Sequence, residues 1–174
     1  MLAAGGASRF SAGHKLLTAF RGRPLVQWAV DAATEAGLDD IVVVTGAVAV
    51  PVDAPTVVNP DWPSGLASSL RVGIAHARSR GHDAVVVGLA DQPLVPSSAW
   101  RAVAAADGPV AVATFDGERR PPVRLAASVW DLLPTTGDEG ARVVMRERPE
   151  LVTEVACDGE PADIDTAEDL ARWS

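Results

Sequence analysis

The chain has 174 residues, 48% of them hydrophobic, which is enough for one domain with a proper core and too few for two, so we expect a single domain over residues 1–174. Its net charge of −8 argues against nonspecific binding to nucleic acid or to an anionic membrane, because both need a basic face. Cys157 is the one cysteine, so the chain has no disulfide framework and no cysteine zinc cluster. No apolar run approaches the roughly 20 residues of a membrane span. We therefore expect a cytoplasmic protein.

The first predicted element is the end of a buried strand, Leu2–Ala4, which runs into Gly5 and Gly6. Because glycine lacks a Cβ atom, backbone N–H groups in this turn can approach an anion, and Arg9 and Lys15 supply the positive charge that a triphosphate needs. Lys15 is the one lysine among 15 basic residues, a point charge that can follow a moving phosphate. The alternative is an ordinary turn with two solvated cations, since the run is neither a Walker loop nor a dinucleotide fingerprint.

The predicted first strand is short. Only Met1 to Ala4 precede the glycines, whereas strands usually run about 5–6 residues. Either the strand is short or translation starts upstream of Met1, and we expect lowered stability for the sequence as numbered.

Helices and strands are then predicted to alternate along the chain. Pro24–Ala36 has the apolar stripe of a helix that Gly37 ends, and Ile41–Thr45 is an apolar β-branched run typical of a strand buried on both faces. The same patterns predict strands at 56–58, 84–89, 110–115 and 151–156, an extended segment at 122–125, and helices starting at Ser64 and at Ser97 or Ser98 and spanning 126–133, 139–148 and 166–173.

This alternation predicts an α/β fold, a Rossmann-like three-layer sandwich with a mostly parallel central sheet and helices on both faces. In such sheets ligands bind beyond the carboxyl ends of the strands. The glycine turn and Asp91 each follow a predicted strand, so we expect the fold to bring them together.

Acidic residues at two places are candidates for holding a metal ion. Asp91 comes directly after a buried strand and is fixed by Pro93, and Mg²⁺ is usually bound by one or two carboxylates together with substrate phosphates. The alternative is that Asp91 caps the next helix or turn. If Ile164 points into the core, Asp163 and Asp165 lie together on the opposite side. Asp165 has a second possible role as a helix N-cap, which Thr166 with Asp169 could equally provide.

Five ordered segments of the chain resemble the MobA-like nucleotidyltransferases. The first is Leu2, Ala3, Ala4, Gly5 and Gly6 with Arg9 and Lys15, and its Ala-Ala-Gly form is closer to the molybdenum cofactor cytidylyltransferases (MocA-type) than to the guanylyltransferases. The others are 59–70, Ala90-Asp91-Gln92-Pro93, Gly137-Asp138-Glu139-Gly140-Ala141-Arg142 and Asp163-Ile164-Asp165-Thr166. The resemblance implies the nucleotide-diphospho-sugar transferase type of fold.

The resemblance also implies roles for individual residues. Arg9, Lys15 and Asp91 would be catalytic, and Asp91 would bind Mg²⁺ with Asp163 and, as second choice, Asp165. The nucleotide would lie on residues 2–6, Arg9, Lys15, Gly65, Ser68 and Ser69. The ordinary alternative for the second of these segments is that Ser64 caps a helix, Trp62 belongs to the core, and Ser68 and Ser69 face water. Asp138 and Arg142 would bind the acceptor, unless they only begin a helix. Arg119-Arg120 replaces the glycine and small residue that the family tends to carry there, so Arg120 could grip a phosphorylated acceptor or the pocket could be reshaped.

The function implied is Mg²⁺-dependent transfer of a nucleoside monophosphate, CMP from CTP, to a phosphorylated acceptor such as molybdopterin, with release of pyrophosphate. A molybdoenzyme or its chaperone is a candidate protein partner. The alternatives are the same fold with a sugar phosphate, a phospho-acid or another pterin as acceptor, a binding protein that has lost turnover, or an unrelated doubly wound domain.

Overall fold

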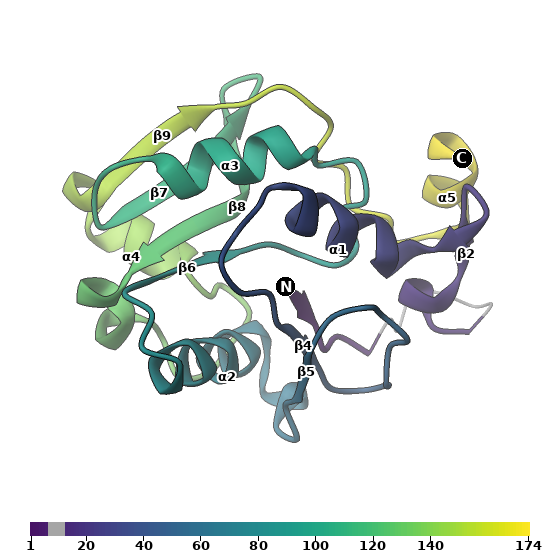
Figure 1. Ribbon diagram of the computed structural model, residues 1–174, viewed down its shortest axis with the longest axis horizontal. Helices are drawn as coiled ribbons and strands as arrows, with labels where there is room; N and C mark the ends of the chain where they lie inside the picture. Colours follow the sequence, from purple (N-terminus) through teal and green to yellow (C-terminus); the bar gives the residue numbers. More distant parts are fainter. Residues whose placement is uncertain (7–12) are drawn as a thin grey trace.

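The computed structural model describes residues 1–6 and 13–174, so Arg9 lies outside the described residues (Figure 1). β1 (Leu2–Ala3) pairs in parallel with β4 (Val43–Thr45), which pairs in parallel with β5 (Thr56–Val58). A second group has the order β6 (Ala84–Val87), β8 (Glu118–Ala126), β7 (Val110–Phe115) and β9 (Val152–Ala156).

Leu2 joins the two groups of strands into one sheet. Its N–H donates to the carbonyl of Gly88 at 2.9 Å, and its carbonyl accepts from the N–H of Ala90 at 3.0 Å, which makes a parallel bridge to Leu89. The order across the sheet is therefore β5-β4-β1-β6-β8-β7-β9. Among these strands, β8 runs antiparallel to both of its neighbours.

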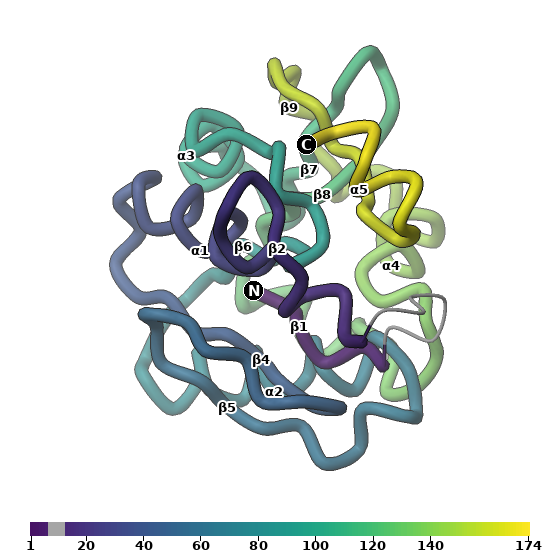
Figure 2. The backbone as a smooth tube through the Cα atoms, turned by 90° about the vertical axis from the view of Figure 1, so that its right-hand side faces the viewer, coloured from purple at the N-terminus to yellow at the C-terminus, as the bar shows by residue number. Residues whose placement is uncertain are grey.

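Helices cover both faces of this sheet. α1 (Leu25–Glu35) and α3 (Ser97–Ala105) bury their apolar stripes on one face, and α2 (Leu66–Ser79) and α4 (Arg142–Glu147) contribute to a second buried cluster on the other. Figure 2 shows α1 and α3 on one side of the strands and α4 on the opposite side. The predicted three-layer α/β class is thereby confirmed.

The remaining elements are short. α5 (Ala167–Trp173) lies beside the hairpin of β2 (Ala19–Phe20) and β3 (Arg23–Pro24), where the Arg21 guanidinium donates to the Trp173 carbonyl at 2.7 Å (Figure 1). The 3₁₀ segments are Lys15–Leu17, Trp62–Ser64, Ala127–Leu132 and Pro149–Leu151. Within the described ranges, no helix combines the length and apolar character that crossing a bilayer requires.

The structure differs from the predicted elements around residues 116–133. The segment predicted only as extended over 122–125 is the nine-residue strand β8, because Asp116 and Gly117, both at positive φ, close a tight hairpin with β7. The helix predicted at 126–133 is a 3₁₀ segment over Ala127–Leu132.

The α-amino group of Met1 is buried between the strands and donates to the Val42 carbonyl at 2.9 Å. Burial lowers the pKa of this amine to about 6, whereas its ordinary value is 8.0. Between these two values the unfolded chain binds the extra proton, so stability should rise with pH. We expect the free energy of unfolding to increase by about 2 kcal/mol from pH 6 to pH 8, as measured by urea denaturation at constant ionic strength.

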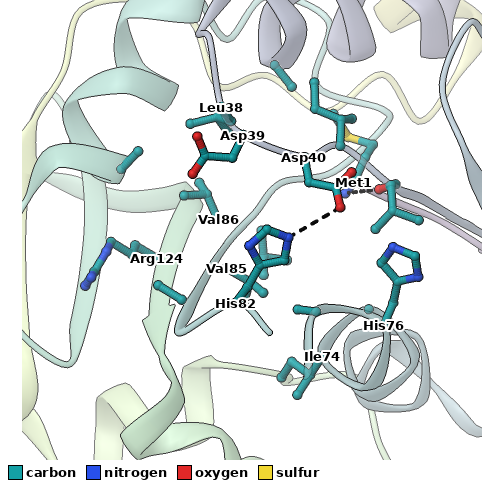
Figure 3. A pocket seen from close by; sticks show the side chains of 18 of the residues that line it. Met1, Leu38, Asp39, Asp40, Ile74, His76, His82, Val85, Val86 and Arg124 are labelled. Atoms are coloured by element: carbon teal, nitrogen blue, oxygen red, sulfur yellow. Dashed lines mark hydrogen bonds and ion pairs between the residues drawn. The ribbon is translucent and has the colours of Figure 1, made fainter. Parts of the chain in front are cut away.

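His76 and His82 line the same groove as Met1 (Figure 3). The matched control is the double variant H76Q/H82Q. Any increase in the free energy of unfolding between pH 6 and pH 8 that remains in this variant is assigned to the Met1 amine. A flat profile in that background would contradict the burial of the amine.

Candidate active site

Three charged side chains from distant parts of the chain meet at the carboxyl edge of the sheet. The Lys15 ammonium donates to Asp91 Oδ2 at 2.6 Å and to Asp165 Oδ1 at 2.5 Å. The side chains are 14%, 21% and 31% exposed, in that order. This contact joins the segment after the glycine turn, the end of the central strand and the segment before the last helix.

Backbone hydrogen bonds hold the two acidic segments against each other. Asp91 directly follows Ala90, whose N–H donates to the Leu2 carbonyl of β1. The Asp91 carbonyl accepts a hydrogen bond from the N–H of Ile164 at 2.9 Å. Ile164 is fully buried, so Asp163 and Asp165 flank a residue anchored in the core. The N-cap of α5 is Thr166, in a reciprocal capping box with Asp169, while the Asp165 carboxylate faces Lys15.

Asp163 lies next to the Lys15, Asp91 and Asp165 side chains and is held there by Gln92. The buried Gln92 amide donates to Asp163 Oδ1 at 3.0 Å and to the Pro161 carbonyl at 3.3 Å. Although Asp163 as a residue is exposed, desolvation of its carboxyl raises its pKa, and the negative charge of Asp91 raises it further. The two carboxylates predicted to share a metal ion are therefore close enough to repel each other.

The charge of Lys15 is held in place by its acidic partners. Burial alone would lower the pKa of this ammonium, but attraction to Asp91 and the hydrogen bonds to Asp165 and Asp91 outweigh burial, so the pKa is raised. Lys15 therefore stays protonated throughout the physiological range.

The carboxylates around Lys15 offer the kind of oxygen ligands that a hard divalent cation needs. Asp91 and Asp165 already present one carboxylate oxygen each to the same cationic nitrogen, and carboxylate oxygens are the ligands that Mg²⁺ prefers. Within residues 1–6 and 13–174, no group of three or more His, Cys, Asp or Glu side chains is placed so that it could hold a metal ion. The residues thus fit a cation that takes its remaining ligands from a substrate and water.

A cleft of about 380 Å³ opens beside these charged groups. Its walls are the end of β1 with the glycine turn, Lys15, the end of β6 and the loop that opens α2. The lining residues are Leu2, Ala3, Ala4, Gly5, Gly6, Lys15, Leu16, Trp62, Pro63, Gly65, Leu66, Ser69, Leu89, Ala90, Asp91, Asp138 and Asp165. Most of the residues assigned to the nucleotide from sequence therefore share one cleft with Asp91.

Ser68 and Ser69 differ in where they lie. Ser69 lines the cleft, whereas Ser68 is not among the lining residues, and its hydroxyl donates to the Gly65 carbonyl at 2.8 Å. The buried amide of Asn59 donates to both hydroxyls, at 2.8 and 2.9 Å, and its oxygen accepts from the N–H of Asp61. The Ser68 hydroxyl thus stabilises the loop through hydrogen bonds to the Gly65 carbonyl and the Asn59 amide.

Asp138 reaches the same loop from the other side. Its carboxylate accepts from the N–H of Leu66 at 3.2 Å and so supplies the side-chain cap that neither Ser64 nor Gly65 gives α2. The expected acceptor residue Asp138 therefore lies in the cleft, at the start of the helix that carries Ser69. Arg142 is exposed at the start of α4 and is not among the lining residues.

Gly65 is expected to be intolerant of a side chain. Its φ is +107°, and a Cβ atom would lie 2.5 Å from the Gly137 carbonyl oxygen. We expect Gly65→Ala to lower the free energy of unfolding by about 1–3 kcal/mol from backbone strain, with the clash in addition. The control is Gly37→Ala, where φ is +73° and no atom lies within 4 Å. Equal losses in urea unfolding of the two variants would show that the contact with Gly137 does not matter.

The two arginines of the unusual segment lie outside the cleft lining. Arg120 pairs with Glu118 at 3.0 Å, and Arg119 pairs with Glu154 on β9 at 2.7 Å. Both ion pairs are exposed, so they are weak and a phosphorylated ligand could compete for either guanidinium. Arg120 on β8 remains a candidate acceptor residue at the carboxyl edge of β7.

Sequence reasoning missed several residues that shape the site. Trp62 lines the cleft and packs so closely on Gly6 that a Cβ there would lie 3.0 Å from its ring. Gln92 orients Asp163, and Asn59 holds the serine loop. The one sequence feature that could have identified these residues is their position inside the segments that resemble the family. Their local context is not enough, because an Asn before Pro or a Gln after Asp occurs in many unrelated structural roles.

Comparison with known proteins agrees with this architecture. The MobA-like NTP transferase domain matches residues 1–152. The chain belongs to this family. Among curated proteins, nicotine blue oxidoreductase of Paenarthrobacter nicotinovorans is 34% identical over 99% of this chain and 93% of that protein. Purine catabolism protein PucB of Bacillus subtilis (strain 168) is 30% identical over 95% of this chain and 90% of that protein.

Solved structures share the fold of this MobA-like chain. Rv0371c from Mycobacterium tuberculosis H37Rv superposes with a TM-score of 0.85 at 28% identity, covering 99% of this chain and 93% of that one. Rv0371c is also known as a complex with manganese, with a TM-score of 0.80. Mth528, a nucleotidyl transferase from Methanothermobacter thermautotroptrophicus, has the same fold, with a TM-score of 0.79 at 24% identity over 98% of this chain and 92% of that one. The fold is that of the nucleotide-diphospho-sugar transferases.

Proposed function

We propose that this MobA-like protein is a Mg²⁺-dependent nucleotidyltransferase that transfers CMP from CTP to a phosphorylated acceptor, with molybdopterin or the molybdenum cofactor as the acceptor. The observation that carries the proposal is the meeting of Lys15 with Asp91 and Asp165 beside the glycine turn. A triphosphate needs both a cation and backbone donors, and this edge of the sheet offers them together with ligands for a metal ion.

In the proposed reaction, an oxygen of the acceptor phosphate attacks the α-phosphorus in line. A bond forms from that oxygen to phosphorus, the bond from the α-phosphorus to the bridging oxygen of the β-phosphate breaks, and pyrophosphate leaves. The attacking phosphate is already ionised, so no general base is needed. The task of the chain is to position both substrates and to neutralise charge, with the glycine turn and Lys15 on the phosphates.

Asp91, together with Asp163 or Asp165, would hold the metal ion. When bound, the ion neutralises charge on the triphosphate. The manganese complex of Rv0371c, 28% identical to this chain, supports a divalent cation in this family. Lys15 would then exchange a carboxylate contact for a phosphate contact, which its flexible stem allows.

A second activity is suggested by the name of one relative. Nicotine blue oxidoreductase is 34% identical over nearly the whole chain, so an oxidation–reduction reaction is the competing function. Against it stands the glycine turn, which lacks the third glycine of the dinucleotide fingerprint. Asp91 with Asp163 or Asp165 also suits a cation and a triphosphate better than a hydride donor.

The test is an assay of the purified protein with each of the four NTPs, Mg²⁺ and molybdopterin, in which released pyrophosphate is measured. We expect release with CTP that needs both Mg²⁺ and acceptor. Sugar phosphates, phospho-acids and other pterins as acceptors distinguish the alternatives within the class. Binding of CTP without release would favour a binding protein that serves a molybdoenzyme or its chaperone. Oxidation of NADH or NADPH in a parallel assay, with no pyrophosphate from any NTP, would replace the proposal with the redox function.

A further inference from the structure

The side chain of His14 connects the glycine turn to the segment that carries Lys15. Its Nε2 lies 2.9 Å from the Gly5 carbonyl oxygen, and Nε2 is the donor because a carbonyl oxygen can only accept. Its Nδ1 is buried and has no hydrogen-bond partner in the described part of the chain. Within that part of the chain, the hydrogen bond of this imidazole is therefore made to Gly5.

This contact fixes the orientation of the peptide that joins Gly5 to Gly6. The Gly5 carbonyl and the Gly6 N–H belong to the same trans peptide, so they point in opposite directions. The preceding peptide is fixed in the same way, because the Ala4 carbonyl accepts from the N–H of Ala47 at 3.1 Å. Two successive carbonyls are thus held by donors of the chain, and the N–H groups of Gly5 and Gly6 point away from those donors.

The N–H groups of Gly5 and Gly6 are available to a ligand in the cleft. Among the described residues, neither of the two N–H groups finds a hydrogen-bond acceptor. Both glycines line the cleft beside Lys15, whereas His14 and Ala47 are not among the lining residues. Successive unpaired N–H groups form a concave site for an anion, and the Lys15 ammonium adds positive charge beside it.

The imidazole of His14 prevents the second of these peptides from turning over. Glycine rotates about φ and ψ more freely than any other residue, so a peptide between two glycines turns over at little cost. The turned peptide would present a carbonyl oxygen, which repels phosphate, in place of a donor. The main chain of His14 is held separately, because its carbonyl accepts from the Leu17 N–H at 2.9 Å. The imidazole can therefore be replaced without displacing Lys15.

We propose that His14 is a positioning residue for the triphosphate, which holds the Gly5–Gly6 peptide with its N–H toward the cleft. The inference rests on the proposed function, because it names what keeps the glycine turn in the form that binds phosphates. His14 acts through the Gly6 N–H and does not itself touch the substrate. The group that it serves is a Mg²⁺-bound polyphosphate, whichever base and acceptor the enzyme takes.

The test measures the affinity for Mg²⁺-bound inorganic triphosphate by calorimetry. His14→Phe keeps a ring and removes the donor, so we expect binding to weaken by about tenfold or more, the usual effect of losing a hydrogen bond to a charged group. His14→Gln places an amide nitrogen as many bonds from Cβ as Nε2 and should restore most of the affinity. The matched control is His82→Phe, which removes an imidazole that contacts Asp40 outside the cleft lining and should leave the affinity unchanged.

Two affinity results would overturn the inference. One is equal affinity of His14→Phe and the wild-type chain, and the other is equal weakening by His14→Phe and His14→Gln, because ring shape and not the donor would then matter. A crystal structure of His14→Phe in which the Gly5–Gly6 peptide keeps its orientation would overturn it as well. In all these cases, pyrophosphate release from CTP by the wild-type chain would leave the proposed function intact. A wild-type chain that neither binds triphosphate nor releases pyrophosphate would overturn both.

Discussion

Replacing Lys15 with alanine is expected to lower kcat/KM for nucleotidyl transfer by about 10²–10³-fold, the usual cost of removing one charged contact to a developing phosphate charge. The ammonium is the described cation that lines the cleft, and it is held within 2.6 Å of both Asp91 and Asp165. Its loss removes positive charge from the triphosphate and leaves two carboxylates facing each other. The measurement is steady-state pyrophosphate release at saturating Mg²⁺ and acceptor.

The matched control for Lys15→Ala is Arg78→Ala. Arg78 also makes a 2.5 Å ion pair with a carboxylate, Asp131, but on the exposed surface away from the cleft. We expect unchanged kinetics for Arg78→Ala and a similar circular dichroism spectrum for both variants. Full turnover by folded Lys15→Ala would remove Lys15 from the proposed mechanism.

The parts of this fold that could be predicted are those that local patterns determine. Val110–Phe115 and Thr56–Val58 were predicted with the bounds that the structure has, because apolar β-branched runs between turns have few other uses. The meeting of Asp91 with Asp163 and Asp165 also follows from local rules. The end of a strand sets the position of Asp91. Alternation about the buried Ile164 sets the positions of Asp163 and Asp165.

The parts that could not be predicted depend on contacts between distant segments. Asp138 caps a helix that begins 72 residues earlier, and nothing in its own neighbourhood indicates that partner. The antiparallel direction of β8 depends on its pairing with β6 and β7, which an extended run alone does not encode. The contact of Lys15 with both carboxylates is likewise a product of the fold, since a basic residue after a glycine turn has many possible partners.

Replacing Asp91 with alanine is expected to reduce turnover at least as much as Lys15→Ala, by about 10³-fold, if its carboxylate binds the metal ion and orients Lys15. Stability should change little, by about 1–2 kcal/mol, because the structural contact of this residue is made by its backbone. Its carbonyl accepts from the Ile164 N–H, and Lys15 keeps Asp165 as a partner. The measurements are pyrophosphate release as a function of Mg²⁺ concentration and the midpoint of thermal unfolding.

Asp131→Ala is the matched control for Asp91→Ala, because Asp131 pairs with Arg78 on the surface and should be dispensable. A variant at Asp91 that keeps full turnover, both at saturating Mg²⁺ and below it, would refute the proposed role. The double variant Lys15→Ala/Asp91→Ala adds a sharper criterion. Since the two side chains touch at 2.6 Å and are proposed to serve the same triphosphate, their losses should be less than additive. Additive losses would mean that the two groups act on separate steps, and the shared site would have to be abandoned.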